Sequence, residues 1–246
     1  MEPVAEPEVR AVRAIQPLDR VAAVIEILLC SGFPTQVLLI GLMAGAGMQM
    51  QTADGHLSPP FIFTLSLVDT VLVVGLVFFF LIAHRESPRR VLLGDRPVLR
   101  EVLAGIALVP AVFVLVLLIL MVILGIAPHL HNVARNPLED MLQTRGDAMI
   151  FGIVVMIAGG VREEIQRGFI VHRFDTFLGG GLVGVVVYSA VFGLGHIEQG
   201  YDAAIATGTL GVVWGLTYVV RRSIVAPMVS HAAFNLAQLI KYVALR

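Results

Sequence analysis

Seven apolar runs constrain the fold of this chain more than any other feature. They lie at 21–47, 61–83, 102–127, 148–172, 179–198, 203–220 and 224–244. Each has roughly the 20 residues that a helix rising about 1.5 Å per residue needs to span a hydrocarbon core. The mean hydropathy of +0.88 and a charged fraction of only 14% indicate that lipid surrounds most of the chain. We therefore predict an all-α, polytopic bundle of about seven transmembrane helices with a polar intramembrane cavity.

The regions outside these runs complete the predicted organisation. Residues 1–20 are polar and mixed in charge, without the apolar core of a secretory signal, so we expect a cytoplasmic N-terminal tail. Three helices are expected in 21–127, the first of them interrupted near Pro34 because proline removes a helix donor. The arginine-rich linker 84–101 is expected at the lipid headgroups. The other four runs form a second transmembrane bundle in 148–244.

Basic residues are divided unevenly between the two sides of this topology. With a cytoplasmic N-terminus, eleven arginines and lysines fall in the inside segments and four in the outside segments. Because loops rich in arginine and lysine remain in the cytoplasm, we expect the N-terminus inside and the C-terminus outside. The net charge of −1 provides no basic surface for nucleic acid. The one cysteine, Cys30, lies in an apolar run and excludes an internal disulfide.

The fourth run carries charges that a membrane helix normally lacks: Arg162, Glu163, Glu164 and Arg167. An ionisable side chain at the centre of a membrane helix costs about 2.5–3.5 kcal/mol on insertion scales, so such residues are functional by default. Residues three or four apart share a helix face, so both glutamates can reach Arg167. Two carboxylates in different environments suit an acid/base pair. The alternative is that the helix ends at Gly160 and the charges lie in water.

Two later runs place polar side chains at four-residue spacing. His231 and Asn235 share one face of the seventh run, which is otherwise apolar, and Tyr188, Phe192 and His196 share one face of the fifth. Two polar groups aimed in the same direction imply a common polar target. The alternative for His231 and Asn235 is an interhelical hydrogen bond.

Further residues are expected around the cavity. Tyr188 and Phe192 precede His196 on its helix face, and Glu198 follows it and is expected to border the cavity mouth. Asp69 is an acid inside the second run, where it can pair with Arg162 or lie at a helix end. These four residues are therefore cavity candidates, without an assigned chemical role.

The order of these motifs resembles the CAAX prenyl protease and bacteriocin-processing family, also called the Abi family. A glutamate pair followed by arginine, then Phe-x-x-x-His, then His-x-x-x-Asn, lie in successive late hydrophobic segments, within residues 150–240. The resemblance implies a glutamic-type intramembrane endopeptidase that hydrolyses a membrane-associated protein or peptide. It also implies that 148–244 is the catalytic bundle, in a multi-pass protein of a bacterial cytoplasmic membrane.

The resemblance assigns roles to six residues: Glu163 and His196 to activate a water molecule, His231 and Asn235 to form the oxyanion hole, and Glu164 and Arg167 to support the site. One departure affects this assignment, because two residues rather than three separate the glutamate pair from the arginine. An alignment on the arginine would put Arg162 in place of the first glutamate and leave the protein inactive. We align on the glutamate pair because Arg167 still reaches both glutamates at helical spacing.

The same residues leave two other functions open. Histidines and glutamates can bind catalytic zinc, but the sequence contains no His-Glu-x-x-His element, so we expect no cofactor and keep a zinc-dependent protease as the second possibility. The non-enzyme alternative is an inactive membrane scaffold or bacteriocin-immunity protein. The expected partners are the lipid bilayer and a membrane-associated substrate, with no nucleic acid and no prediction of oligomeric state.

Overall fold

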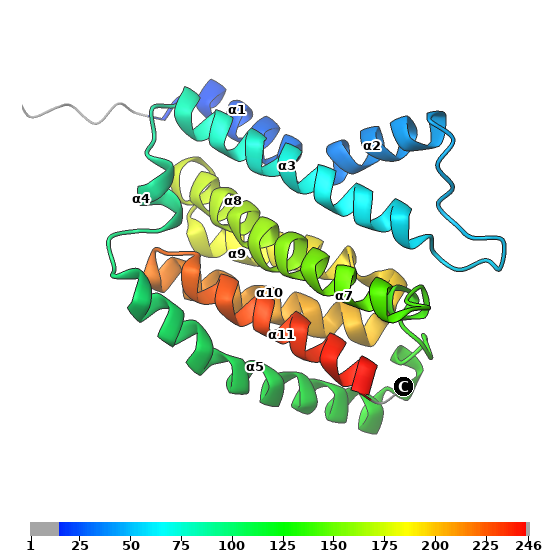
Figure 1. Ribbon diagram of the computed structural model, residues 1–246. Helices are drawn as coiled ribbons and strands as arrows, with labels where there is room; N and C mark the ends of the chain where they lie inside the picture. Colours follow the sequence, from blue (N-terminus) through cyan, green and yellow to red (C-terminus); the bar gives the residue numbers. More distant parts are fainter. Residues whose placement is uncertain (1–14, 245–246) are drawn as a thin grey trace, which may run out of the picture.

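The computed structural model describes residues 15–244, which form an all-α bundle (Figure 1). Most of the predicted tail, residues 1–14, lies outside the described residues. The helices are α1 (Pro17–Leu29), α2 (Phe33–Gly45), α3 (Pro59–Ala83), α4 (Pro88–Leu92), α5 (Val98–Ile126), η1 (Pro128–Leu130), α6 (Pro137–Asp140), α7 (Arg145–Val154), η2 (Val155–Arg162), α8 (Glu163–Phe177), α9 (Gly181–Leu194), η3 (Ile197–Gln199), α10 (Tyr201–Arg221) and α11 (Val225–Ala244). The predicted fold class is thereby confirmed.

The apolar character of the long helices makes this an integral membrane protein. Among the described residues, α3, α5 and α10 are each long and apolar enough to cross a membrane, and the bent pair α1–α2 would be a fourth span. Large apolar side chains point outward from many helices, as lipid contact requires: Val37, Val71, Leu117, Met121, Val186 and Val220. The number of seven spans remains a prediction, although every predicted run contains helix.

The first predicted run is broken, as its proline indicated. α1 and α2 meet at an angle of 41°. Gly32 between them has a φ of 85°, a left-handed conformation that glycine adopts without steric cost. Pro34 lies in the first turn of α2, where a missing backbone donor does not matter.

The fourth run does not end at Gly160. α7, η2 and α8 follow one another without a break, and the residues of η2 form a π-helix. Such widened turns are frequent at functional sites. The charged residues 162–167 therefore lie inside a helical run, with apolar helix on both sides of them.

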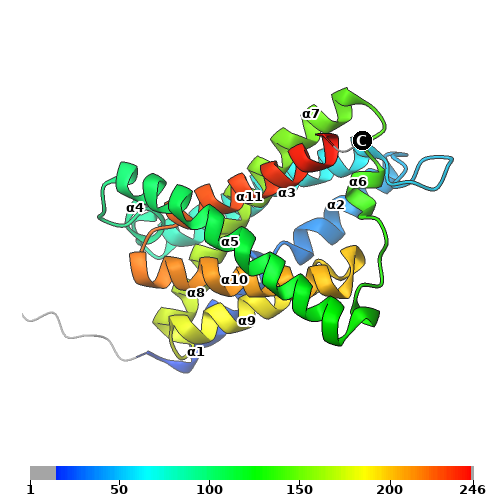
Figure 2. The same cartoon turned by 90° about the horizontal axis from the view of Figure 1, so that it is seen from below.

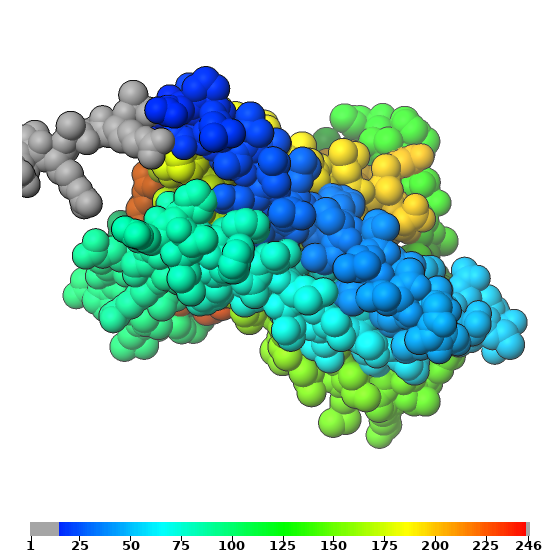
Figure 3. Space-filling model, turned by 90° about the horizontal axis from the view of Figure 1, so that it is seen from above, coloured from blue at the N-terminus to red at the C-terminus, as the bar shows by residue number. Residues whose placement is uncertain are grey.

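The helices are arranged in layers around this run. α9 packs on α8 and α10, while α11 packs on η2 and α5 (Figure 1). Figure 2 shows α5 crossing the bundle on the face next to α10 and α11. On the opposite face, the bent pair α1–α2 lies alongside α3 and covers part of the bundle (Figure 3). The charged helix is thus enclosed by neighbours on several sides.

A buried ion cluster fixes one end of α8 to the N-terminal helices. Arg173 is fully buried; its Nε lies 2.6 Å from Glu26 on α1 and its Nη1 lies 2.5 Å from Glu86 after α3. His84 Nε2 lies 2.6 Å from Glu26, and His172 Nε2 lies 3.0 Å from Glu86. Burial raises the pKa of Glu86, but the hydrogen bonds from His172 and Arg173 outweigh it and leave the pKa below its usual range.

We expect Arg173→Gln to destabilise the protein by about 3–5 kcal/mol, because removal of one member of a buried ion pair leaves an uncompensated charge. The matched control is Arg222→Gln: its ion pair with Asp175 has side chains that are 62% and 36% exposed, and such pairs contribute about 0–1 kcal/mol. Thermal unfolding in one detergent compares the two variants. Equal losses of stability in the two variants would show that the buried cluster stabilises the protein no more than the exposed ion pair does.

Candidate active site

A cavity of about 510 Å³ lies between α3, α5, η2, α10 and α11. The four residues predicted to be catalytic all line it: Glu163, His196, His231 and Asn235. Part of its wall is apolar, with Val116, Leu120, Val154, Leu210 and Phe234 among the lining side chains. Polar groups from three separate segments of the chain therefore face one largely apolar space.

Glu163 lies at the first turn of α8, where η2 delivers it to the cavity. Its Oε2 lies 3.8 Å from Nε2 of His231, and its Oε1 accepts a hydrogen bond of 3.2 Å from Nη2 of Arg162. Arg162 also donates to Asp69 on α3, at 2.8 Å, so the possible Asp69–Arg162 pair is confirmed. Glu163 is thus held by Arg162, while one carboxylate oxygen remains directed toward His231.

Of the two glutamates expected within reach of Arg167, Glu164 forms the ion pair with it, whereas Glu163 pairs with Arg162. Arg167 donates through Nη1 to Oε1 of Glu164, three residues earlier, and both side chains are only 1% exposed. The guanidinium lies 4.9 Å from the ring centre of Phe192 and 5.4 Å from those of Tyr188 and Trp214. These rings attract the cation, and Arg167 itself does not line the cavity.

His231 connects the two glutamates. Its Nδ1 lies 2.8 Å from Oε1 of Glu164, and the ring stacks on Trp214 with centres 3.9 Å apart. Trp214 donates through Nε1 to Ser230, at 3.3 Å. An ionised carboxylate only accepts hydrogen bonds, so Nδ1 carries the proton and Nε2 faces Glu163. Glu164 at the ring edge and Trp214 on the ring face therefore fix the orientation of the imidazole.

His196 follows the last turn of α9, and its orientation is fixed by its own helix. Nδ1 lies 2.8 Å from the carbonyl oxygen of Phe192, four residues earlier. Because a carbonyl only accepts, Nδ1 is the protonated nitrogen, and a neutral ring then has a lone pair on Nε2. The geometry thus gives His196 an available proton acceptor.

Asn235 lies one helical turn beyond His231 and approaches η2 closely. A Cβ atom at Gly159 would lie 2.5 Å from Nδ2 of Asn235, and one at Gly160 would lie 2.7 Å from Cβ of Ala232. Any larger side chain at these positions would displace α11 or its amide. The two glycines therefore allow the contact that brings Asn235 to the cavity.

The four cavity candidates lie outside the cavity wall. Tyr188 and Phe192 pack against Arg167, Asp69 binds Arg162, and Glu198 lies on the short helix η3; among the described residues, none of the four lines the cavity. Phe192 still contacts the site, because its ring centre lies 6.1 Å from that of His231.

Sequence reasoning missed several lining residues: Arg162, His131, Asn136, Gln199 and Trp214. Asp202, which the sequence placed with Glu198 at the cavity mouth, does line the cavity, and its Oδ2 lies 2.6 Å from Nδ1 of His131. Trp214 is the one tryptophan of the chain, and its place in an apolar run gave no signal of a role beyond packing.

Whether the site could bind a metal ion depends on which donor side chains the structure brings together. Within residues 15–244, no group of three or more His, Cys, Asp and Glu side chains is arranged to hold a metal ion. The donors that line the cavity include an amide, Asn235, which is a poor ligand for zinc. Absence of a cofactor stays a prediction.

We expect Gly160→Ala to destabilise the protein by about 1–3 kcal/mol, the usual cost of adding a methyl group to a packed contact. The control is Gly75→Ala on α3, since a Cβ at Gly75 meets no atom within 4 Å. Thermal unfolding in detergent measures both. Unchanged stability of Gly160→Ala would mean that η2 and α11 separate without cost.

Comparison with known proteins identifies the C-terminal bundle. Residues 145–237 match the sequence family described as type II CAAX prenyl endopeptidase Rce1-like. No curated protein and no solved structure matches the chain. The matched segment begins at α7 and reaches into α11, so it contains the glutamate pair, Arg167, His196, His231 and Asn235. The similarity to the CAAX prenyl proteases therefore rests on this segment, which is less than half of the chain.

Proposed function

We propose that this protein is an intramembrane endopeptidase of the glutamic type, whose substrate is a membrane-associated protein or peptide. The family is one of proteases. The observation that carries the proposal is that Glu163, His196, His231 and Asn235 line a single cavity although they come from three segments of the chain. The apolar wall of that cavity suits an apolar peptide and limits the water around the reacting groups.

In the proposed reaction, a water molecule lies between Glu163 and His196. Oε2 of Glu163 takes a proton from the water, and the lone pair on Nε2 of His196 accepts a hydrogen bond that orients it. The oxygen attacks the peptide carbonyl to form a tetrahedral intermediate. Glu163 then returns the proton to the amide nitrogen, the C–N bond breaks, and an acid and an amine leave.

The negative charge of the intermediate requires fixed donors. Asn235 offers its Nδ2 amide. His231 acts in its doubly protonated form, with Nδ1–H on Glu164 and Nε2–H toward the oxyanion. Because Glu164 is already compensated by Arg167, it offers a fixed acceptor that holds His231 in place. Removal of one such donor lowers turnover by about 100- to 1,000-fold in enzymes where it has been measured.

The choice of Glu163 over Arg162 as the residue aligned with the first family glutamate is supported by geometry. Arg162 is bound to Asp69 and Glu163, and a guanidinium cannot accept a proton from water. Glu163 directs an oxygen toward His231. The Arg162–Glu163 pair also favours the alternative, an inactive scaffold or immunity protein, because it occupies one oxygen of the carboxylate.

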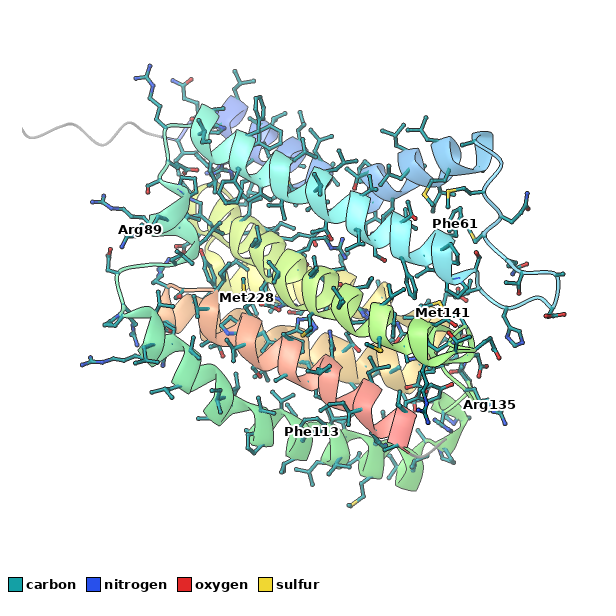
Figure 4. The ribbon with its side chains drawn as sticks, viewed as in Figure 1. Phe61, Arg89, Phe113, Arg135, Met141 and Met228 are labelled. Atoms are coloured by element: carbon teal, nitrogen blue, oxygen red, sulfur yellow. The ribbon has the colours of Figure 1, made fainter. Side chains whose placement is uncertain are left out.

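We also propose that the N-terminus is cytoplasmic and the C-terminus external. Nine arginines of the described residues lie at the end of the bundle that carries α4: Arg20, Arg85, Arg89, Arg90, Arg96, Arg100, Arg173, Arg221 and Arg222. The opposite end carries three basic residues: Arg135, Arg145 and Lys241. Figure 4 shows Arg89 and Arg135 at opposite ends. Positively charged ends remain in the cytoplasm.

Glu163→Gln should abolish proteolysis, with a loss of about 100- to 10,000-fold for a missing general base, while the protein remains folded. The matched control is Glu198→Gln, because Glu198 lies outside the cavity wall. Cleavage products of co-expressed membrane-anchored proteins are compared among wild type and both variants.

Three outcomes of this experiment would contradict the proposal. Full activity of Glu163→Gln with complete loss in Glu164→Gln would overturn the alignment. No cleavage by the wild type, with an unchanged cellular phenotype of Glu163→Gln, would favour the scaffold. Loss of activity on chelation, with recovery on addition of zinc, would favour a zinc-dependent protease.

Asn235→Ala should lower kcat by about 100- to 1,000-fold with little change in KM, because an oxyanion donor acts mainly in the transition state. Gly159→Ala keeps the amide but displaces it, so kcat should fall here as well. If Asn235 were only an interhelical hydrogen bond, its loss would lower the thermal stability, by about 0.6 kcal/mol on average, and leave turnover per folded molecule unchanged.

A further inference from the structure

A second cavity, of about 660 Å³, adjoins the active-site cavity. It is lined by polar and charged side chains: His56, Arg135, Glu139, Asp140, Gln143, Gln238, Lys241 and Tyr242. Glu139 and Gln238 line both cavities, which are therefore neighbours. We call this second cavity the vestibule.

The vestibule lies at the end of the bundle opposite α4. Its residues come from the segment between α2 and α3, from the segment between α5 and α7, and from the last turns of α11. Arg135, one of its lining residues, lies at the far end from Arg89 in Figure 4. On the orientation proposed above, this is the external end.

The active-site cavity itself becomes more polar toward the same end. His131, Asn136, Gln199 and Asp202 line it where the segment after α5 meets η3 and the start of α10. Phe234, Leu210 and Val116 lie on the transmembrane helices. A segment that enters from the vestibule would thus pass from polar to apolar surroundings before it reaches Glu163.

The arginine-rich end also carries a pocket, of about 460 Å³, but this pocket shares no lining residue with the active-site cavity. Among the described residues, no side chain of α4, of residues 84–97 or of residues 221–224 lines the active-site cavity. Close contacts hold the helices together near this pocket: Arg173 is held by Glu26 and Glu86, Tyr218 donates to the carbonyl of Val91 at 2.9 Å, and the backbone of Ile224 donates to that of Leu92 at 2.8 Å.

We infer that the substrate is a membrane-anchored polypeptide whose cleavage segment lies on the external side, and that its hydrophilic part occupies the vestibule while the scissile bond reaches Glu163. The inference rests on the proposed function. Arg135 and Lys241 face Glu139 and Asp140 in one space, so the vestibule presents both signs of charge. Mixed charge suits the polar groups of a peptide, whereas an anionic lipid headgroup would be met by basic residues alone.

The side of the entrance is tested by labelling with a membrane-impermeant maleimide. Cys30 is fully buried and is the one cysteine of the chain, so the wild type should not react. Gln143→Cys, exposed in the vestibule, should be labelled in right-side-out vesicles and protected in inverted ones. Asp95→Cys, exposed next to α4, should show the opposite pattern. His56→Cys provides a second vestibule position if Gln143→Cys does not fold.

The route is tested on the same proteins. A polyethylene glycol maleimide of about 5 kDa is attached at Gln143→Cys. Cleavage of the membrane-anchored reporter should then fall at least about tenfold below that by the unmodified Gln143→Cys variant. Attachment at Asp95→Cys should leave cleavage unchanged. Labelling of Gln143→Cys from inverted vesicles alone would overturn the external entrance, and unchanged cleavage after its modification would overturn the route. The labelling pattern does not depend on catalysis, so it tests the entrance separately from the proposed function. Unchanged cleavage by Glu163→Gln would instead contradict the proposed peptidase.

Discussion

The buried ion pair of Glu164 and Arg167 is the interaction on which the rest of the site depends. Both side chains are 1% exposed in an otherwise apolar bundle, and each charge would be costly without the other. Arg167 obtains three aromatic faces from α9 and α10, and Glu164 obtains the Nδ1 proton of His231 from α11. Satisfying this one pair therefore positions three other helices against α8.

A second buried ion pair connects this helical run to the N-terminal helices in the same way. Arg162 binds Asp69 of α3, and Asp69 in turn accepts hydrogen bonds from Thr35 and Gln36 of α2. Charges on successive residues of the helical run thus point in different directions: Arg162 toward α2 and α3, and Glu164 toward α11. Glu163, between them, is the carboxylate left to face the cavity. In this arrangement the supporting charges are neutralised in pairs, and a single carboxylate oxygen is available for chemistry.

The comparison of prediction and structure shows where sequence patterns are informative. Hydropathy predicted the helical class, and the four-residue spacing placed His231 and Asn235 on one face that lines the cavity. The spacing also placed Tyr188, Phe192 and His196 in successive ring contacts, although Tyr188 and Phe192 do not line the cavity. A shared helix face states which neighbours a side chain can reach, but the competing partners on other helices decide which one it takes. Here Arg167 binds Glu164 and lies against three aromatic rings, while Glu163 pairs with Arg162.

The sequence by itself determined that the chain is a helical membrane protein with an unusual concentration of charge at 162–167, because apolar runs and ionisable residues inside them have few physical alternatives. It also ordered the motifs that mark the family. Only the tertiary structure decided that Arg162 binds Asp69, that Trp214 stacks on His231, and that the cavity adjoins a polar vestibule at the end opposite the arginines. These contacts join residues far apart in the chain, and their formation depends on how whole helices pack, which no local pattern of residues records.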